Sequence, residues 1–331
     1  MKRVGKLIEQ IADIDNLYVA FIKACRGKQR KTEVLRFRSC FDHNIATLRQ
    51  EILSGNVDVG HYHFFTIHDP KERLICAAPF RERVLHHAIM NVCHQYFDKR
   101  LIDSTYATRP GKGIYAALDY AIKAASRYEY LVKLDFRKYY DSIQHDVMKY
   151  KLARMFKDPV LLNIFYRIID SYHADTKVGL PIGNLTSQYF ANTYLSDLDH
   201  KVKEQYRVPI YIRYMDDMLL AENDKGKLMS VVHSLEAYSY EKLSLTLKPP
   251  ICHKSINGIP FLGYRILPYR YLLSGRSKRR FRSKLLDYDS KLKRGDWSEA
   301  DYKEHILPLL SFVNHAESYS FRQSCLNITK W

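Results

Sequence analysis

Two adjacent acids, Asp216 and Asp217, lie within an otherwise largely apolar stretch from Pro209 to Ala221. This pattern predicts two β-strands joined by a tight turn at Met215, Asp216 and Asp217. Neighbouring carboxylates at the tip of an apolar hairpin repel each other unless cations neutralise them. Asp is also a favoured residue in solvent-exposed turns. By itself the pair is therefore compatible with a plain turn as well as with a cation site.

A third acid stands at the end of another predicted strand. Tyr130 to Phe136 is a short apolar run interrupted only by Lys133, and Asp135 lies near its C-terminal end. If this strand neighbours the hairpin in one sheet, the three carboxylates converge at one edge. Joining a nucleotide to a primer 3′-hydroxyl uses two divalent metal ions, and Mg²⁺ prefers carboxylate oxygens. Asp135, Asp216 and Asp217 are the candidate catalytic residues and metal ligands.

The remaining pattern mixes helices and strands. Helical spacing of apolar residues predicts helices within 1–55, at 88–97, after Gly183, at 227–243 and from Gly275 onward. Strand patterns occur at 61–67 and 261–267. No regular βαβ alternation is visible, so we expect an α+β fold. A length of 331 residues fits one large lobe with an appended subdomain.

The charge balance favours a polyanionic partner. The chain has 53 Lys and Arg against 36 Asp and Glu, a formal net charge of +17. Basic residues spread along a chain suit contact with many phosphates, and the 26 tyrosines suit stacking on bases. A basic protein whose charge only keeps it dispersed is the alternative. Without CxxC pairs, a signal peptide or a membrane-spanning stretch, we expect a cytoplasmic protein that does not bind membranes.

Four motifs in order resemble those of reverse transcriptases. Tyr214-Met215-Asp216-Asp217 matches the YxDD core of the family's polymerase signature, and Leu131 to Ile143, with Asp135, resembles its first palm motif. Gly179 to Gln188 falls where the template-positioning loop and helix are expected. Phe261-Leu262-Gly263-Tyr264 resembles the primer-grip hairpin. The resemblance covers nearly the whole chain.

The resemblance implies a right-hand polymerase that copies RNA into DNA. Fingers and palm would occupy residues 1–270, with fingers mainly at 1–129 and 145–178 and palm at 130–144 and 179–270. A basic helical thumb would occupy 271–331. Two Mg²⁺ ions, with Mn²⁺ as a substitute, would be bound by the three aspartates and the backbone carbonyl of Phe136. Template RNA, the RNA–DNA duplex and dNTPs would be the partners.

The same resemblance assigns contacts to the incoming nucleotide. Tyr140 matches the steric gate that excludes a ribose 2′-hydroxyl, although it is also readable as an aromatic packed after a strand. Arg73, and less strongly Lys71, match the fingers segment that closes over the triphosphate, and each is also readable as a solvated charge beside a turn. Lys248 or Lys254 would protonate the departing pyrophosphate. The loop contributes Ile182, Gly183 and Gln188.

Further residues are implied in nucleic-acid binding. Tyr214 and Met215 flank the aspartates, and Phe261, Leu262, Gly263 and Tyr264 would hold the primer. In the thumb, basic residues would follow the template–primer duplex, unless they form only a charged surface; these are Arg276, Lys278, Arg279, Arg280, Arg282 and Lys284.

The middle motif points to one branch of the family. Ile182 before Gly183, with Ser187-Gln188 after it, resembles the reverse transcriptases of diversity-generating retroelements. Such enzymes copy a template repeat RNA with errors at adenines and work with a basic, helical accessory variability protein, in a bacterial or phage-infected cell. Group II intron-type and antiviral-defence reverse transcriptases remain alternatives, as does a relative that binds nucleic acid without catalysis.

Overall fold

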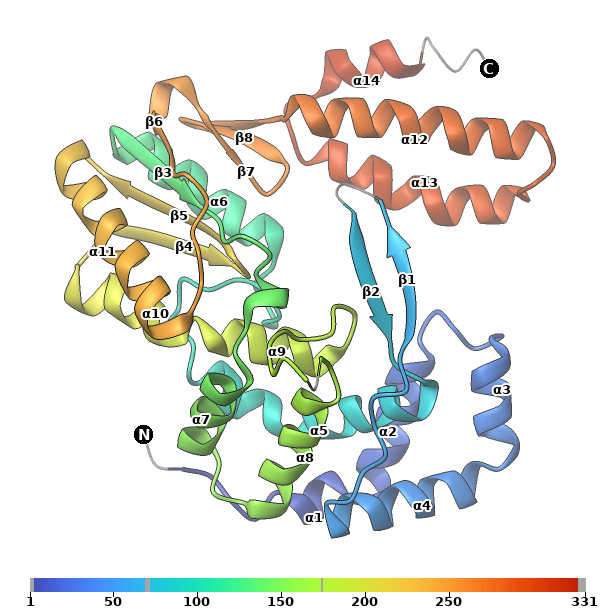
Figure 1. Ribbon diagram of the computed structural model, residues 1–331. Coiled ribbons are helices and arrows are strands. Elements are labelled where there is room, and N and C mark those ends of the chain that lie inside the picture. Colours follow the sequence, from blue (N-terminus) through green and yellow to red (C-terminus); the bar gives the residue numbers. More distant parts are fainter. Residues whose placement is uncertain (1–2, 69–71, 174, 327–331) are drawn as a thin grey trace. The chain divides into compact units, whose positions relative to one another are not determined.

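The computed structural model describes residues 3–68, 72–173 and 175–326 (Figure 1). The backbone divides into two compact units. The first unit contains the chain up to residue 103 together with 136–205 and 234–247. The second contains 104–135, 206–233 and the chain from 248 onward. Each unit is therefore assembled from separate stretches, and the covalently joined Asp135 and Phe136 belong to different units.

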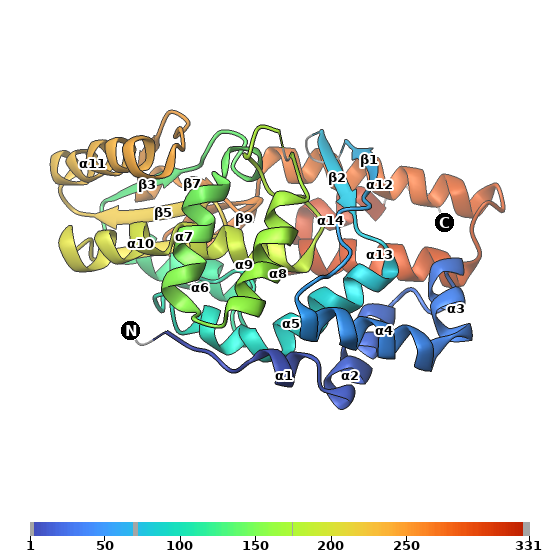
Figure 2. The ribbon, with the colours of Figure 1, turned by 60° about the horizontal axis from the view of Figure 1, so that its bottom comes forward.

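The first unit is largely helical. Its elements are α1 (Ile8–Ile11), α2 (Ile14–Cys25), α3 (Thr32–Ser39), α4 (Phe41–Ser54), β1 (His63–Ile67), β2 (Arg73–Ala77), α5 (Phe80–Asp98), the 3₁₀ turn η1 (Tyr140–Ser142), α7 (His145–Met155), α8 (Pro159–Asp170), α9 (Leu185–Tyr194), α10 (Ser196–His200) and the π-helical turn η2 (Lys201–Gln205). Figure 2 shows α1 and α2 beside α5, against which both pack.

An aromatic cluster forms the centre of this unit. Phe97 of α5, Phe156 after α7, Phe165 of α8 and Phe190 of α9 are all buried. Their ring centroids lie 5.3–6.2 Å apart in tilted and edge-to-face pairs, the arrangements that aromatic rings prefer. The cluster fixes α9, and therefore the loop that precedes it, to the other helices.

The second unit contains two antiparallel sheets and the C-terminal helices. Its elements are α6 (Ile114–Arg127), β3 (Tyr130–Leu134), β4 (Ile210–Tyr214), β5 (Asp217–Glu222), β6 (Ile251–Lys254), the 3₁₀ turn η3 (Ser255–Asn257), β7 (Ile259–Phe261), β8 (Tyr264–Leu267), β9 (Arg270–Leu273), α12 (Gly275–Lys293), α13 (Glu299–Asn314) and α14 (Tyr319–Leu326). Helix α11 (Lys225–Leu243) begins in this unit, and its residues from 234 onward belong to the first.

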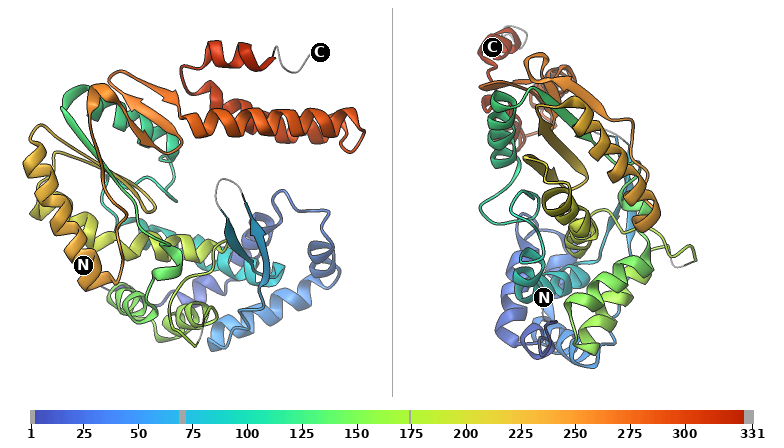
Figure 3. Two further views of the ribbon diagram at one scale, coloured as in Figure 1. Left: turned by 45° about the horizontal axis from the view of Figure 1, so that its top comes forward. Right: turned by 90° about the vertical axis from the view of Figure 1, so that its left-hand side faces the viewer.

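The larger sheet has the strand order β4-β5-β3-β6. Helix α6 packs on it through Ala117, Leu118 and Ala121, which share a buried cluster with strand residues such as Leu131 and Leu219. The smaller sheet has the order β7-β8-β9. Figure 3 shows α12 and α13 side by side beyond it. The mixture of helices with antiparallel sheets confirms the predicted α+β class.

Two expected elements are interrupted. The predicted long helix after Gly183 is divided into α9, α10 and η2, although Ala191, Tyr194 and Leu198 are all buried as its periodicity indicates. The predicted single strand at 261–267 is wrong. This segment instead contains a hairpin with a two-residue turn, in which Leu262 (φ +48°) and Gly263 (φ +88°) connect β7 to β8. In the described part of the chain, no helix has both the length and the apolar composition needed to cross a bilayer.

Candidate active site

The β4–β5 hairpin presents the adjacent aspartates as predicted. Tyr214 pairs with Asp217, so Met215 and Asp216 form the two-residue turn. Met215 has φ +54°, a left-handed conformation that is uncommon for a residue with a side chain. Arg213 holds this turn, because its Nη1 donates a hydrogen bond to the Met215 carbonyl at 3.0 Å. The hairpin therefore adopts a strained turn that a neighbouring side chain stabilises.

Arg213 was not predicted from the sequence, and it is fully buried. Its backbone is also fixed, since its N–H donates to Ser104 O at 3.0 Å and its carbonyl accepts from Tyr106 N at 2.9 Å. A buried guanidinium is costly unless its donors are satisfied. The available signal was a basic residue within the apolar strand Ile210–Tyr214.

Asp135 lies at the same end of the sheet. Strand β3 pairs antiparallel with β5, and the last pair is Leu134 with Met218. Continuing this register places Asp135 opposite Asp217. The condition under which the sequence placed the three carboxylates at one edge, that these strands are neighbours in one sheet, is met, and all three aspartates belong to the second unit.

The carboxylates interact electrostatically. Burial, together with the negative charges of Asp217 and Asp135, raises the pKa of Asp216 to about 6. Two lysines offset part of this charge. Lys248 Nζ lies 2.5 Å from Asp135 Oδ2, and Lys133 Nζ lies 2.7 Å from Asp217 Oδ1. A cation delivered to this site would relieve the same repulsion.

The donor set fits a hard divalent cation. Asp217 Oδ1 is buried and has no hydrogen-bond partner, since its pair with Lys133 lacks hydrogen-bond geometry. Carboxylate oxygens are the ligands that Mg²⁺ takes. Among the described residues, however, no three acidic, His or Cys side chains are gathered closely enough to hold an ion. In this arrangement two of the three carboxylates face lysines, which must move aside for a metal to bind.

Lys248 and Lys254, the two candidate proton donors, have different acidic partners. Lys248 is fixed to the site twice, because its backbone N–H also donates to the Asp135 carbonyl at 2.9 Å. Lys254 instead pairs with Glu129 at 2.9 Å and lies over the Tyr130 ring. Of the two candidates, only Lys248 lies at the aspartates. Lys133 was visible in the sequence as the one charge in its apolar strand, but its pairing with Asp217 was not predicted.

Phe136 and Tyr140 follow Asp135 in the sequence, and both belong to the first unit. Phe136 is buried and forms a bridge to Leu247. Tyr140, in η1, is half-buried, and its ring meets Tyr139 edge-to-face at 5.8 Å. The Tyr140 carbonyl accepts a hydrogen bond from Leu180 N at 2.9 Å. The backbone at Tyr140 and the loop that begins at Gly179 are thus joined directly.

The Gly179–Gln188 segment is also joined to β2. The Ile182 carbonyl accepts a hydrogen bond from Cys76 N at 2.8 Å. Gly183 has φ +124°, and a Cβ there would lie 3.0 Å from Cys76 O, so any other residue would be both strained and crowded. Ile182 and Gln188 are half-buried. The structure therefore brings Tyr140, Ile182 and Gly183 together within the first unit.

A buried polar chain that was not predicted supports this loop. Glu82 Oε1 lies 3.2 Å from His86 Nε2, and His86 Nδ1 lies 2.9 Å from Thr186 Oγ1 in the first turn of α9. All three side chains are at most 2% exposed. Glu82 Oε2 accepts a hydrogen bond from Gly60 N at 3.0 Å. No sequence pattern pointed to this chain of contacts, because Thr186 on α9 is distant in sequence from Glu82 and His86.

Arg73 is exposed at the end of β2, opposite Ile67. Within the described part of the chain it forms no ion pair. Lys71 lies outside the described residues. Of the two candidates for contact with the triphosphate, the structure therefore describes only Arg73, which presents an accessible guanidinium on the β1–β2 hairpin.

Of the four primer-grip candidates, two are buried in the core and two form the hairpin turn. Phe261 and Tyr264 are buried, and Tyr264 OH donates to the Phe312 carbonyl at 2.7 Å. Leu262 and Gly263 form the turn, and the Gly263 carbonyl accepts from Ser277 Oγ at 2.6 Å. The hairpin tip is thus fastened to the start of α12.

The basic residues of α12 occupy more than one face. Lys278 and Arg282 lie over the Phe321 ring of α14, at 5.6 and 5.2 Å from its centroid. Arg280 and Lys284 instead line a groove against α13. Arg276 and Arg279 are exposed.

A protein-family model described as "Reverse transcriptase (RNA-dependent DNA polymerase)" matches residues 68–266, more than half of the chain. All three aspartates and the four motifs lie inside this range. The match rests on sequence, whereas the hairpin geometry and the carboxylate interactions come from the structure.

Curated relatives match at low identity. The putative COX1/OXI3 intron 2 protein of Saccharomyces cerevisiae is 18% identical over 82% of this chain and 40% of its own length. The Retron Ec73 reverse transcriptase of Escherichia coli is 28% identical over 32% of this chain and 36% of its own. The chain thus spans less than half the length of these relatives.

Among solved structures, similarity extends to telomerases of Candida. Telomerase from Candida albicans, in complex with a fragment of telomeric RNA, is 11% identical, with 89% of this chain and 60% of that chain covered at a TM-score of 0.48. A truncated apo telomerase from Candida tropicalis is 13% identical, with 65% and 55% covered at the same score.

Proposed function

This chain belongs to the reverse transcriptase family of RNA-dependent DNA polymerases, and we propose that it extends a DNA primer on an RNA template. The observation that carries this proposal is the placement of Asp135, Asp216 and Asp217 at one end of the β3–β5 sheet by the pairing of these strands. A group of half-buried acids is costly in a protein that only needs a turn. It is useful where divalent cations and a triphosphate must be bound.

Asp135, Asp216 and Asp217 are proposed to hold two Mg²⁺ ions, with Mn²⁺ as a substitute, and the Phe136 carbonyl to complete one coordination shell. When bound, such ions activate the primer 3′-hydroxyl and stabilise charge on the triphosphate. Lys248 neutralises Asp135 in their absence. Once released from that carboxylate, its ammonium is proposed to donate a proton to the departing pyrophosphate.

Nucleotide selection is assigned to the first unit. Tyr140 is proposed to exclude a ribose 2′-hydroxyl, and the backbone bond from Leu180 to its carbonyl couples it to the Ile182–Gly183 loop. Arg73 presents a planar guanidinium with several donors, which suits a triphosphate. Lys71 and Gln188 are assigned supporting contacts in this proposal. The unit's fixed hydrogen bonds favour a preformed pocket wall.

The polymerase subdivisions follow from these roles. Residues 1–129 and 145–178 are proposed as fingers, 130–144 and 179–270 as palm, and 271–331 as thumb. Tyr214, Met215 and the Leu262–Gly263 turn would contact the primer. Phe261 and Tyr264 act by supporting that turn, because their side chains are buried. The basic residues of α12 would contact the RNA–DNA duplex.

Single-turnover primer extension on an RNA template tests the proposed site. Asp135→Asn, Asp216→Asn and Asp217→Asn keep side-chain shape but weaken metal binding, so each should lower the rate by roughly 100-fold or more. Asp224→Asn is a matched control, because Asp224 is an exposed acid just after β5. Its Oδ1 accepts a hydrogen bond from Lys227 N, and the side-chain oxygen of an Asn can accept the same bond. Equal rates for wild type and the three site variants would refute the assignment.

We further propose that the enzyme belongs to a diversity-generating retroelement of a bacterial or phage-infected cell, and acts in its cytoplasm. Its RNA would then be a template repeat, its cDNA would carry errors at adenines, and a basic helical accessory protein would assist it. The half-buried aliphatic Ile182 supports this reading. An amide at that position can hydrogen-bond a template nucleotide, whereas Ile182 only fills space, which weakens selection of the correct pair.

Sequencing of cDNA made by wild type and Ile182→Gln separates the branches. We expect wild type to misincorporate opposite template adenines, and the variant to do so less often. Unchanged error frequency in the variant would remove Ile182 from the account. Accurate synthesis by wild type would favour an intron-type enzyme, and products independent of the template would favour an antiviral-defence relative.

A further inference from the structure

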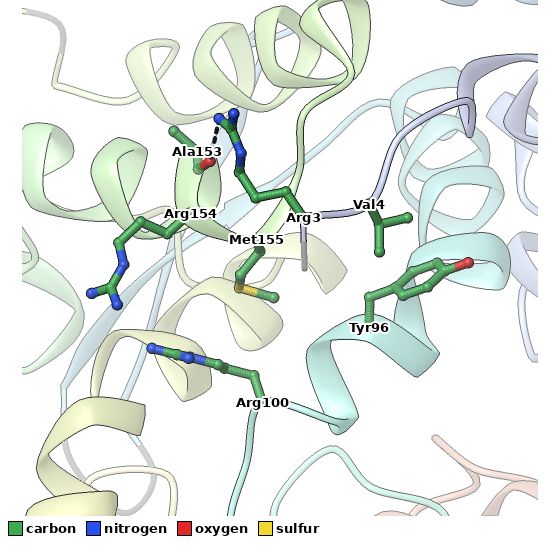
Figure 4. Close-up of a pocket in the computed structure, with 7 residues that line it drawn as sticks. All are labelled: Arg3, Val4, Tyr96, Arg100, Ala153, Arg154 and Met155. Carbon is green, nitrogen blue, oxygen red and sulfur yellow. Dashed lines mark hydrogen bonds between the residues drawn. The ribbon is translucent and has the colours of Figure 1, made fainter. Parts of the chain in front are cut away.

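A cavity of about 280 Å³ in the first unit has a strongly basic lining. Figure 4 shows its walls, which come from the N-terminal segment, the end of α5 and the end of α7. Three of the lining residues are arginines, and none belongs to the polymerase motifs; the lining consists of Arg3, Val4, Tyr96, Arg100, Ala153, Arg154 and Met155.

The positive charge around this cavity exceeds the negative charge. Arg100 donates to Asp197 Oδ1 at 2.7 Å, but Asp197 is shared with Lys151, whose Nζ lies 2.5 Å from Oδ2. Burial would raise the pKa of Asp197, yet Lys151 and Arg100 outweigh burial and lower it, so this acid stays ionised. Within the described residues, Arg3 and Arg154 form no ion pair. One acid therefore faces several cations.

The guanidinium groups remain able to take a further acceptor. Arg3 Nη1 donates only a long bond, 3.5 Å, to the Ala153 carbonyl. Arg154 is exposed, and its guanidinium lies over the Tyr150 ring, 5.8 Å from the ring centroid. A guanidinium has five N–H donors, so Arg100 keeps donors beyond its bond to Asp197. In Figure 4 the Arg100 and Arg154 guanidinium groups extend toward the same side of the cavity.

The cavity also has an apolar and aromatic wall. Tyr96 is half-buried, and Val4 and Met155 lie beside it. Backbone bonds fix this wall, since Val4 N donates to Met155 O at 2.9 Å and Lys157 N donates to Val4 O at 2.7 Å. Lys99 lies over the Tyr96 ring at 5.8 Å. A fixed aromatic wall beside arginines suits a base and its phosphate.

We propose that this cavity is a second nucleic-acid site, which binds a nucleotide of single-stranded RNA. Arg3, Arg100 and Arg154 contact its phosphate, and Tyr96 with Met155 contacts its base. Arginine binds phosphate with paired, planar donors, and aromatic rings accept any base. The site lies outside the motifs that hold primer and incoming nucleotide, so it does not rest on the polymerase assignment. Its role would be to anchor RNA that is not being copied.

Photocrosslinking of an RNA oligonucleotide tests this proposal. The probe is a single-stranded RNA of about 12 nucleotides carrying 4-thiouridine, added to the full chain together with a saturating primer–template duplex, and the crosslinked residue is identified by mass spectrometry. We expect a crosslink at Tyr96 or Met155. Arg154→Glu and Arg3→Glu should each reduce its yield about 10-fold and lower the salt dependence of RNA binding by about one phosphate contact.

Arg49→Glu is the matched control, because Arg49 is an exposed arginine on α4 of the same unit and lies outside the cavity. It should leave the crosslink unchanged, and all three variants should keep wild-type melting temperatures and extension rates on a short duplex. Absence of the Tyr96 or Met155 crosslink, or equal yields in all three variants, would overturn the proposal. Displacement of the RNA by equimolar sodium triphosphate would overturn the RNA assignment in favour of a free polyphosphate.

Discussion

At the scale of single residues, Arg213 determines the shape of the turn that carries Asp216. It is fully buried, and its Nη1 donates to the Met215 carbonyl. Arg213→Met should lower the free energy of unfolding by roughly 2 kcal/mol, because the carbonyl loses a charged donor. It should also lower the rate of primer extension more than the affinity for primer–template, since the aspartates lose their placement.

Thermal melting and single-turnover kinetics check this prediction. Arg265→Met serves as control, because Arg265 also donates to a backbone carbonyl, that of Asn257, but is exposed. The control should change neither quantity appreciably. An Arg213→Met protein with the rate and stability of wild type would show that the turn does not need this bond.

The sequence predicted the three aspartates but not their partners. Asp135 and the Asp216–Asp217 pair stand at the ends of recognisable apolar strands, so local pattern was sufficient to place them at strand ends. Lys133 meets Asp217 only because β3 pairs antiparallel with β5 in one register. Such pairs depend on the register in which distant strands pair, and no local sequence pattern reveals that register.

At the scale of elements, Gly183 controls how the loop before α9 approaches β2. Gly183→Ala should destabilise the protein by about 1–3 kcal/mol, since φ +124° is strained for alanine and its Cβ would lie 3.0 Å from Cys76 O. Gly27→Ala separates these causes, because Gly27 also has positive φ (+70°) but nothing within 4 Å. Denaturant unfolding should therefore show a larger loss for Gly183→Ala. Equal losses would mean that the close approach costs nothing.

Helix α5 should make stability depend on pH. Burial, together with the positive charge of Lys23 and other nearby basic residues, lowers the pKa of His87 to about 4. Between about pH 6.5 and 4 the unfolded chain therefore binds a proton that the folded chain does not. The contribution of neutral His87 to the free energy of unfolding is therefore fully present above pH 6.5, and it decreases as the pH falls toward 4.

The free energy of unfolding, measured across this pH range, should decline less steeply in His87→Gln than in the wild type. His145, whose pKa burial also lowers, should leave part of the decline in place. His63→Gln, at an exposed position on β1, is the control and should retain the wild-type slope. A His87→Gln curve parallel to that of wild type would contradict the prediction.

Periodicity predicted the existence of most elements better than their ends. Helices in the first 55 residues, the β4–β5 hairpin and α11 follow the expected patterns. Periodicity missed the break after Tyr194 and the turn at Leu262–Gly263, although the resemblance of Phe261–Tyr264 to a hairpin indicated the second. At the second site the strand pattern continues on both sides, and the positive φ of Leu262 is not visible in its residue type.

At the scale of the whole molecule, the order of motifs was predictable but the division into units was not. Each unit is built from separate stretches, with Asp135 in one and Phe136 in the other. The basic helix α12 was expected, yet its charges face α14 as well as the α13 groove. A period of 3.6 residues distributes closely spaced basic residues around a helix, so composition alone overstates the surface offered to one duplex.

The most direct test of the account is primer extension on a defined RNA template with Mg²⁺, supplied with either dNTPs or rNTPs and followed by sequencing of the product. The account predicts DNA complementary to the template, made from dNTPs and not from rNTPs, and absent with Asp216→Asn. Failure of the folded wild type to make template-complementary DNA, even with its native RNA and accessory protein, would contradict it. An equal product from Asp216→Asn would contradict it as well.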